Sequence, residues 1–363
     1  MRIALVHDYL NQYGGGERVL EVLCEIFPRA PIFSLIYDEK ATGKVFRNRE
    51  IHTSFLQKIP FIQKHHRLFP MLMPLAVEQF DFSYFDVVIS NSASFAKGII
   101  TKPKTKHISY CMTPTRFLWG GSHKFIEEFD YSWPVKKLIP MFMTYLRVWD
   151  QEAAARVDQF VAISSFIQKR IKKYYNRESE VIYPPVDTKK FSTNQQTNKN
   201  GEYFLMVGRL VPYKKFDLAV KSFNELGYPL KIIGDGPERK KLEKISKKNI
   251  EFLGLVSDFK LPPYYNKAKA VIFPQEEDFG IVPVEAMAAG KPVIAYRGGG
   301  ALETIKEGET GEFFDEQNVE SFIKTLANFN ERNYNPDKIK SHALQFDKDI
   351  FKQKILKLTG NLL

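Results

Sequence analysis

Residues 273–295 read FPQEEDFGIVPVEAMAAGKPVIA, and this stretch decides the fold that the sequence predicts. It begins at the end of an apolar strand, passes through an acidic loop and a helical segment, and returns to a second apolar strand. Pro283 suits the first position of the helix, and Gly290 suits its C-terminus. A helix between two short apolar strands is typical of a βαβ unit with parallel strands.

The same alternation extends through both halves of the chain. In the first half we expect strands at Arg2 to Val6, Phe85 to Ser90, His107 to Cys111, Phe160 to Ile163 and Glu180 to Tyr183. From Tyr203 the pattern restarts with the runs YFLMVG, LKIIGDG, IEFLG, AVIFP and PVIAY. Both halves therefore predict an α/β fold with parallel sheets and crossover helices.

The length of 363 residues exceeds what one hydrophobic core usually supports, so we expect two domains. Pro184 and Pro185 interrupt regular structure, and the polar segment STNQQTNKNGE soon after them is typical of a linker. We place an N-terminal domain at 1–192 and a C-terminal domain at 193–345. Residues 346–363 carry an amphipathic helix, which we expect to pack back on the N-terminal domain.

Composition excludes several classes of protein. Neither Cys24 nor Cys111 has CxxC spacing, so neither a disulfide framework nor a zinc site is indicated. The start MRIALVHDYL lacks the features of a signal peptide, and no run of about 18 apolar residues offers a membrane span. These features favour a cytoplasmic protein without a bound metal.

The formal net charge of +11 indicates an anionic partner. A nucleic acid, an anionic membrane surface and a phosphorylated ligand all remain open from charge alone. A solvated lysine-rich surface explains the charge equally well, because the run ERKKLEKISKK at 238–248 has the pattern of an exposed helix face.

Two cations follow the first strand of the second half. The segment VGRLVPYKK places Arg209 and Lys214 just beyond the carboxyl end of that strand, where open α/β sheets bind ligands. Arginine holds phosphate oxygens in a bidentate manner and lysine acts as a mobile point charge, so the pair suits a diphosphate. Ordinary surface cations would give the same pattern.

The opening stretch adds amides and carboxylates. Gly280, Ile281 and Val282 are expected to expose N–H groups at a helix N-terminus, which attracts phosphate. Glu285 is expected in the first helical turn and Glu277 in the loop before it, so both are candidates to accept hydrogen bonds from sugar and ribose hydroxyls. A capping glutamate and a solvated acidic loop would look the same.

Two glycine-rich turns also precede helices. HDYLNQYGGGERVLEVL contains Gly15 and Gly16, and YRGGGALETI contains Gly299. Glycine lets a backbone approach a ligand closely, and the helix N-terminus behind each turn attracts anions. Neither turn has the GxGxxG spacing of a dinucleotide site or the GK[ST] of a P-loop, which disfavours an oxidoreductase and an NTPase.

Together these motifs resemble the glycosyltransferase family 4 pattern of the GT-B fold over nearly the whole chain. The most specific match is E-x7-E, formed by Glu277 and Glu285, joined by Arg209 and Lys214. Further matches are GGGER, VAISSFI at 161–167, VIYPPVDTKKF at 181–191 and GGGALE at 298–303. The resemblance implies two Rossmann-like domains that face each other across a cleft.

The resemblance also implies the reaction. A retaining, metal-independent enzyme without a cofactor would move a hexose, preferably mannose-like, from a GDP- or UDP-linked sugar to a glycan or polyprenyl-linked acceptor, in the assembly of a bacterial surface polysaccharide. Glu277, Arg209 and Lys214 would be catalytic, and Glu285 would bind the ribose. Phosphate or sugar contacts would come from the amides of Gly15, Gly16, Gly280, Ile281, Val282 and Gly299.

One position departs from the family pattern. Relatives often carry a histidine in the segment that corresponds to HISYCMTPTRFLW, where this chain has Met112. Methionine neither donates a hydrogen bond to a hydroxyl nor carries a proton. The usual acceptor-side or sugar-binding histidine therefore lacks a counterpart, and we interpret His107 and His123 nearby as structural.

The acceptor is expected in the N-terminal domain. Residues 55–75 and 133–149 mix basic and large apolar side chains, which suits an interfacial helix on anionic headgroups. Such a helix predicts peripheral attachment to the inner face of the cell membrane. Core helices with cationic solvent faces would give the same pattern.

Two other classes of function stay open. A sugar-nucleotide epimerase or a phosphorylase would share the architecture; the first needs no acceptor, and the second needs a lysine for pyridoxal phosphate. A basic protein without catalysis, bound to a membrane or a nucleic acid, is the third possibility. Because zinc-finger, RRM and helix-turn-helix signatures are missing from the sequence, we expect no nucleic-acid partner.

Overall fold

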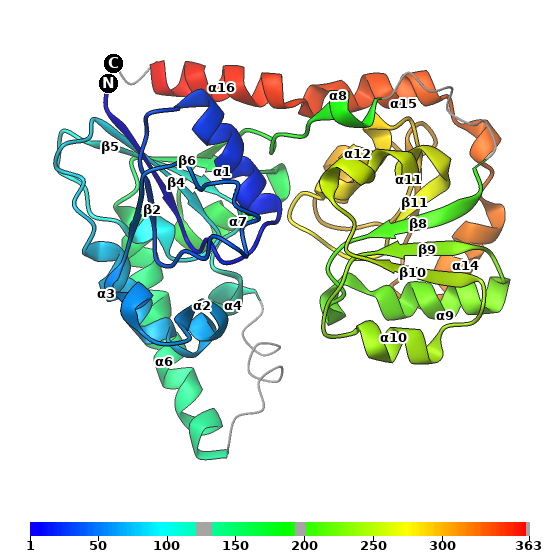
Figure 1. Ribbon diagram of the computed structural model, residues 1–363, viewed down its shortest axis with the longest axis horizontal. Helices are drawn as coiled ribbons and strands as arrows, with labels where there is room; N and C mark the ends of the chain where they lie inside the picture. Colours follow the sequence, from blue (N-terminus) through cyan, green and yellow to red (C-terminus); the bar gives the residue numbers. More distant parts are fainter. Residues whose placement is uncertain (121–132, 193–200, 361–363) are drawn as a thin grey trace. The chain divides into compact units, whose positions relative to one another are not determined.

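The computed structural model describes residues 1–120, 133–192 and 201–360. Backbone contacts divide the chain into two compact units (Figure 1): unit 1 is Met1–Tyr183 with Lys352–Leu363, and unit 2 is Pro184–Phe351. The chain thus changes unit at the Pro184–Pro185 pair, and most of the expected linker lies at 193–200, outside the described residues. The domain limits taken from the sequence stay a prediction.

Unit 1 contains a parallel sheet with the strand order β3-β2-β1-β4-β5-β6-β7 in the described part of the chain. The order reverses between β1 and β4, which makes their carboxyl ends a topological switch point. The strands β2 and β3 are new relative to the sequence prediction. The strands are β1 (Ile3–His7), β2 (Ile32–Ser34), β3 (Ile51–Thr53), β4 (Val87–Ser92), β5 (Lys106–Cys111), β6 (Gln159–Ala162) and β7 (Ser179–Val181).

Helices cover both sides of this sheet (Figure 1). Side chains of α2, α3 and α6 pack with Val6 and Val88 in one core, while α1 and the final helix α16 (Lys348–Gly360) lie on the opposite side. An ion pair of 2.5 Å between Lys352 and Glu25 joins α16 to α1. The α-helices of the unit are α1 (Gly15–Ile26), α2 (Ile62–His65), α3 (Met73–Glu78), α4 (Arg116–Trp119), α6 (Trp133–Ala155) and α7 (Ser165–Tyr175).

The prediction of an interfacial helix over residues 55–75 is wrong in its local structure. The segment forms short helical pieces instead, namely η1 (Phe55–Lys58), α2, η2 (His66–Leu68), η3 (Pro70–Leu72) and the start of α3. Pro70 begins η3 and Pro74 lies in the first turn of α3. Proline supplies no backbone donor and its ring clashes with the preceding turn, so these prolines favour a break in the helix.

A buried ion pair fixes the loops at the carboxyl side of β4 and β5. Lys97 and Asp150 are buried, and their Nζ and Oδ1 atoms lie 2.5 Å apart. Thr115, Trp119 and Tyr175 all donate hydrogen bonds to the same carboxylate. Because a buried pair needs such extra bonds to offset desolvation, this network favours one arrangement of the loops that α6 and α7 support.

Unit 2 repeats the architecture, with the strand order β10-β9-β8-β11-β12-β13 among the residues that the structure describes. Its switch point lies between β8 and β11. All five strands predicted from Tyr203 onward are confirmed, and β13 is added. The strands are β8 (Tyr203–Val207), β9 (Leu230–Ile233), β10 (Ile250–Gly254), β11 (Ala268–Phe273), β12 (Val293–Tyr296) and β13 (Gly311–Phe314).

Two layers of helices enclose this sheet, with α9, α10 and α14 on one side and α8, α11, α12 and α15 on the other (Figure 1). Phe204 and Met206 of β8 point to the first layer, where they pack with Phe223 of α9 and Phe322 of α14. The α-helices are α8 (Thr188–Phe191), α9 (Phe216–Leu226), α10 (Arg239–Ile245), α11 (Pro262–Lys267), α12 (Ile281–Ala288), α13 (Ala301–Thr304), α14 (Val319–Asn328) and α15 (Pro336–Ala343). The 3-10 turns of unit 2 are η5 (Pro212–Lys214), η6 (Asp258–Lys260), η7 (Glu331–Asn333) and η8 (Leu344–Phe346). Unit 1 has the further 3-10 turn η4 (Ala96–Gly98).

Candidate functional site

The loops at the carboxyl edge of the unit 2 sheet approach one another through glycines. A Cβ on Gly234, after β9, would lie 1.9 Å from the carbonyl oxygen of Gly208, after β8. A Cβ on Gly299, after β12, would lie 2.3 Å from the carbonyl oxygen of Glu277, after β11. Both glycines also have positive φ, so side chains are excluded by space and by backbone conformation.

Lys214 and Glu277 meet at this edge. Lys214 ends η5, and its Nζ lies 2.6 Å from Oε1 of Glu277, with the two side chains 14% and 20% exposed. Gln275 donates a second hydrogen bond of 3.2 Å to the same oxygen. The structure therefore brings two of the predicted catalytic side chains into direct contact.

The environment keeps Lys214 charged. Burial alone would lower the pKa of Lys214, but the negative charge and the hydrogen bond of Glu277 outweigh burial and hold this pKa above its ordinary value. The positive charge of Arg209 acts on Lys214 in the opposite direction, which places the guanidinium in the same electrostatic environment. The two predicted cations thus belong to one site.

The helix α12 begins two residues earlier than the sequence indicates. Gly280 is its N-cap with a φ of 92°, Ile281 is its first residue, and Pro283 is its third. Proline is accepted there because the third N–H of a helix also lacks an intrahelical acceptor. Gly280, Ile281 and Val282 thus occupy the helix start as predicted, and within the described residues their N–H groups donate to no backbone or side-chain acceptor.

Glu285 consequently lies in the second turn of α12, which corrects the prediction of a first-turn position. Its side chain is buried, and its Oε2 accepts a hydrogen bond of 2.6 Å from the hydroxyl of Tyr265 on α11. The sequence analysis missed this partner, because nothing in the residues around Tyr265 indicates that its hydroxyl binds a carboxylate of the site. The tyrosine fixes the orientation of the carboxylate.

The turn after β12 supports the acidic loop. The N–H of Gly300 donates a hydrogen bond of 2.8 Å to the carbonyl of Glu277, and Gly299 beside it has a φ of 60°. The sequence analysis also missed Gln275. Its position two residues before Glu277 in the same loop could have indicated that its side chain contacts this carboxylate. Loop, turn and α12 together hold the Glu277 side chain next to Lys214.

The remaining predicted residues, Gly15 and Gly16, lie in unit 1. Gly15 is the first residue of α1, behind the N-cap Gly14, at the switch point beside β1 and β4. Both glycines thus lie at the start of a helix in unit 1. Their role in donor binding stays a prediction.

Met112 follows β5 directly, and its N–H donates a hydrogen bond of 2.8 Å to the carbonyl of Ser92. His107 on the same strand is fully buried and its Nε2 lies 2.8 Å from the Ser90 hydroxyl. Burial lowers the pKa of His107 to about 3, so the ring is neutral and structural, as interpreted from the sequence. His123 lies outside the described residues.

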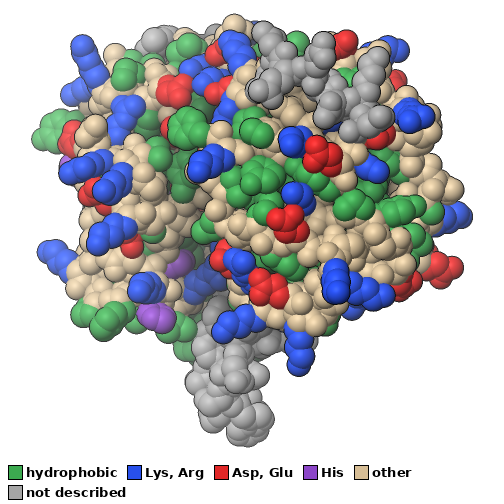
Figure 2. Space-filling view, turned by 45° about the vertical axis from the view of Figure 1, so that its right-hand side comes forward, with side chains coloured by type: hydrophobic (Ala, Val, Ile, Leu, Met, Phe, Trp, Pro, Cys, Tyr) green, Lys and Arg blue, Asp and Glu red, His purple; other side chains and the backbone are tan. Residues whose placement is uncertain are grey.

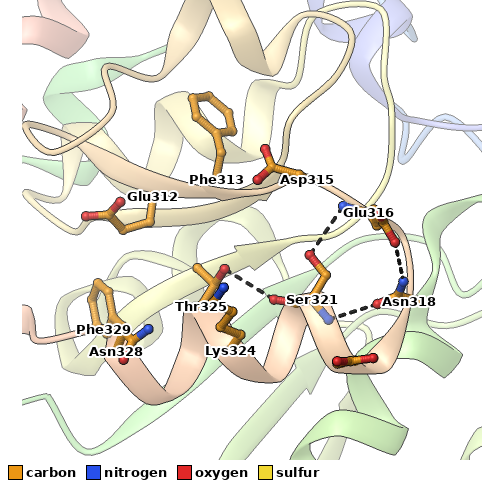
Figure 3. Close-up of a pocket in the computed structure, with 11 residues that line it drawn as sticks. Glu312, Phe313, Asp315, Glu316, Asn318, Ser321, Lys324, Thr325, Asn328 and Phe329 are labelled. Atoms are coloured by element: carbon orange, nitrogen blue, oxygen red, sulfur yellow. Dashed lines mark hydrogen bonds between the residues drawn. The ribbon is translucent and has the colours of Figure 1, made fainter.

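A separate pocket of about 660 Å³ lies between β13 and α14 of unit 2 (Figure 3). Hydrogen bonds among Glu316, Asn318 and Ser321 close one end of it. No predicted site residue lines it, so pocket size does not identify the site. In the parts of the chain that the structure describes, no group of three or more metal-ligating side chains is assembled.

Comparison with known proteins places this geometry in a family. The model for the glycosyl transferases group 1 matches residues 187–346, and the model for Glycosyltransferase Family 4 matches residues 13–190. The two matches follow one another along the chain and join near the change of unit. The chain belongs to the family 4 glycosyltransferases.

Curated relatives match about half of the chain. An uncharacterized glycosyltransferase of Methanocaldococcus jannaschii is 32% identical over 177 residues, which are 47% of this chain and 49% of the relative. A GDP-mannose-dependent α-(1-6)-phosphatidylinositol monomannoside mannosyltransferase of Mycobacterium tuberculosis is 29% identical over 199 residues, 47% of this chain and 52% of the relative. The chain spans about half the length of the first curated relatives it matches.

Solved structures match the chain over its whole length. Anabaena HepE in complex with UDP has a TM-score of 0.74 at 18% identity, with 99% of this chain and 100% of that chain covered. Sucrose-phosphate synthase from Thermosynechococcus elongatus has a TM-score of 0.74 at 15% identity, with 100% and 99% covered. These matches confirm the predicted GT-B architecture of two Rossmann-like units.

The contact between Lys214 and Glu277 yields a first prediction. Glu277→Gln removes the negative charge that neutralises Lys214, so inorganic pyrophosphate should bind the variant roughly tenfold more tightly than the unaltered chain, as a charge-assisted contact becomes available. Isothermal titration calorimetry measures the change. Glu276→Gln is the matched control, because Glu276 is exposed and should leave the affinity unaltered. Equal affinities in all three proteins would contradict an anion site at Lys214.

Proposed function

We propose that the chain transfers a hexosyl unit from a nucleotide-diphosphate sugar to a glycan or polyprenyl-linked acceptor, with retention of the anomeric configuration and without a metal. One observation carries the proposal: at a switch point, Glu277 in the loop before α12 pairs with Lys214, and the charge of Arg209 acts on the same lysine. Fixed cations and amides stabilise a leaving diphosphate as its charge develops.

The proposed roles follow from this geometry. Arg209 and Lys214 hold the diphosphate, together with the amides of Gly280, Ile281 and Val282. When phosphate oxygens bind Lys214 in place of Glu277, the carboxylate of Glu277 can accept a hydrogen bond from a hexose hydroxyl. In the front-face reaction that we propose, the bond from the anomeric carbon to the diphosphate breaks, the acceptor oxygen bonds to the same face, and its proton passes to the departing phosphate.

The comparisons support a nucleotide-sugar donor without fixing its base. Anabaena HepE was solved with UDP and with UDP-glucose, whereas the mycobacterial relative is named as GDP-mannose-dependent. A second mannosyltransferase relative, from Dictyostelium discoideum, is 23% identical over 292 residues. We therefore propose mannose as the sugar and GDP as the first nucleotide to test, in the assembly of a surface polysaccharide.

We also propose that unit 1 docks on an anionic membrane to reach a polyprenyl-linked acceptor. No helix in residues 1–120, 133–192 and 201–360 meets the length and hydropathy needed to cross a bilayer. On α6, however, Met141 and Tyr145 are 62% and 56% exposed, and Phe61 beside α2 is 75% exposed. Exposed Lys58, Lys64 and Arg67 accompany Phe61, a mixture of basic and apolar groups that suits anionic headgroups.

The charges on one face of the molecule are not arranged as a nucleic-acid site requires. On the face drawn in Figure 2, lysines and arginines are scattered among acidic and apolar side chains. A nucleic-acid site needs cations aligned along a groove. The scattered pattern there is that of a solvated surface.

Truncation of either cation should lower transfer. Arg209→Ala and Lys214→Ala are each expected to reduce kcat/KM by at least tenfold, about 1.4 kcal/mol of transition-state stabilisation, with the fold intact. Transfer is measured with a radiolabelled nucleotide sugar and lipid-linked acceptors. Lys221→Ala on the exposed side of α9 is the control for loss of a positive charge. Wild-type rates in both site variants would remove the diphosphate clamp.

Removal of metal should leave the reaction intact. Since cations and amides of the protein serve the diphosphate, transfer in excess EDTA should equal transfer in added Mg²⁺. The two rates are compared after dialysis of enzyme and donor against the chelator. A strict requirement for a divalent ion would contradict the proposed metal-free reaction.

Membrane attachment has its own test. The double variant Phe61→Ser, Met141→Ser replaces two exposed apolar side chains, so its binding to vesicles with anionic lipid should fall roughly tenfold in co-sedimentation. Phe259→Ser in unit 2, where Phe259 is 90% exposed, is the control. Equal binding by all variants, or binding to neutral vesicles alone, would overturn the proposed surface.

A further inference from the structure

A buried polar cluster lies beneath the glycine-rich loop of unit 1. His7 is the last residue of β1, Asn91 stands opposite it in the register of β4, and Glu17 lies in the first turn of α1. The three residues are 6%, 0% and 4% exposed. Buried polar groups of this kind require partners, and their partners here are in the loop.

Side chains of this cluster hold both ends of the loop Gly14–Gly16. Oε2 of Glu17 accepts a hydrogen bond of 2.8 Å from the N–H of Gly14. Nδ2 of Asn91 donates a hydrogen bond of 2.7 Å to the carbonyl of Gly16. A Cβ on Gly16 would lie 3.4 Å from Cε1 of His7, so the loop rests on the imidazole ring.

His7 connects these two anchors. Its Nε2 lies 3.5 Å from Oε1 of Glu17, and its Nδ1 lies 3.2 Å from the carbonyl oxygen of Asn91. Nδ1 is also 3.2 Å from the side-chain amide of Asn91, but in the doubly protonated imidazolium both ring nitrogens can donate to these two oxygens. The imidazole ring thus lies between Glu17, which holds Gly14, and Asn91, which holds Gly16.

The charges around His7 favour that protonated form. Burial alone would lower the pKa of His7, but Glu17 and the nearby charge of Asp8 outweigh burial and raise this pKa above its ordinary value of 6.5. Burial would raise the pKa of Glu17, yet its contact with His7 lowers it. Asn91 on β4 adds no charge, and Asp8 is itself bound by four backbone N–H groups, those of residues 93–96.

We propose that His7, Glu17 and Asn91 are positioning residues, which hold the Gly14–Gly16 loop and the start of α1 in the conformation that contacts the donor. The inference rests on the proposed function, since the loop is taken to meet the phosphates or sugar of a nucleotide sugar. Loss of the His7 proton leaves the buried carboxylate of Glu17 with a weaker partner. The loop is then released from the ring, and transfer falls.

The sign of the pH dependence follows from the raised pKa of His7. The ion pair is complete below the ordinary pKa of histidine and is lost as the pH rises through the higher pKa in the folded protein. We expect kcat/KM to fall on the alkaline side with the ionisation of His7. The His7 ring resonances in a proton NMR titration report that ionisation independently of activity.

Two variants and a control sharpen this experiment, with profiles recorded from about pH 6 to pH 9. Glu17→Gln should shift both the His7 titration and the alkaline limb to lower pH, and should reduce kcat/KM roughly tenfold to a hundredfold through misplacement of the loop. His7→Gln should abolish the limb. Glu25→Gln changes the same residue type on the same helix, at its ion pair with Lys352, and should leave the profile unaltered.

The outcomes separate the inference from the proposed function. If wild-type transfer does not follow the His7 titration, or if His7 is neutral and accepts from the Asn91 side-chain amide 3.2 Å away, the inference is overturned. That result would leave transfer itself intact. If the unaltered chain transfers no sugar from any GDP- or UDP-linked donor, the proposed function fails instead, and the NMR titration still decides the protonation of His7.

Discussion

The ion pair between Lys214 and Glu277 is the interaction on which the candidate site depends. It joins the loop after β8 to the loop after β11, the two strands that flank the switch point of unit 2. The two side chains neutralise each other, with Nζ of Lys214 and Oε1 of Glu277 2.6 Å apart. We propose that a diphosphate bound to Lys214 also releases Glu277, so that phosphate binding and sugar binding are coupled through one contact.

That contact requires a backbone that few residues permit. The loops after β8, β9, β11 and β12 come so close that glycines are needed where they touch, and Gly234 and Gly299 have no room for a side chain. The arrangement also gives α12 an N-terminus whose first amides remain available to an anion. The charged site thus depends on uncharged residues, which set the distance between its loops.

Much of the fold was predictable, because strands buried on both faces appear as continuous apolar runs. The strands β2 and β3 were not predictable, because each has only three residues and so short a segment shows no periodic pattern of apolar side chains. The start of α12 was misplaced because proline is accepted at the third helical position as well as the first. Sequence motifs indicated Arg209, Lys214 and Glu277, but their contact, and the support from Tyr265 and Gln275, depend on tertiary packing that no local pattern encodes.

A crystal structure of the chain soaked with GDP-mannose or UDP-glucose tests the central claim most directly. The account predicts the pyrophosphate at about 3 Å from Lys214, from Arg209 and from the amides at the start of α12, with the contact between Lys214 and Glu277 broken and Glu277 turned to the sugar. A pyrophosphate bound elsewhere on unit 2, with that ion pair intact, would contradict it.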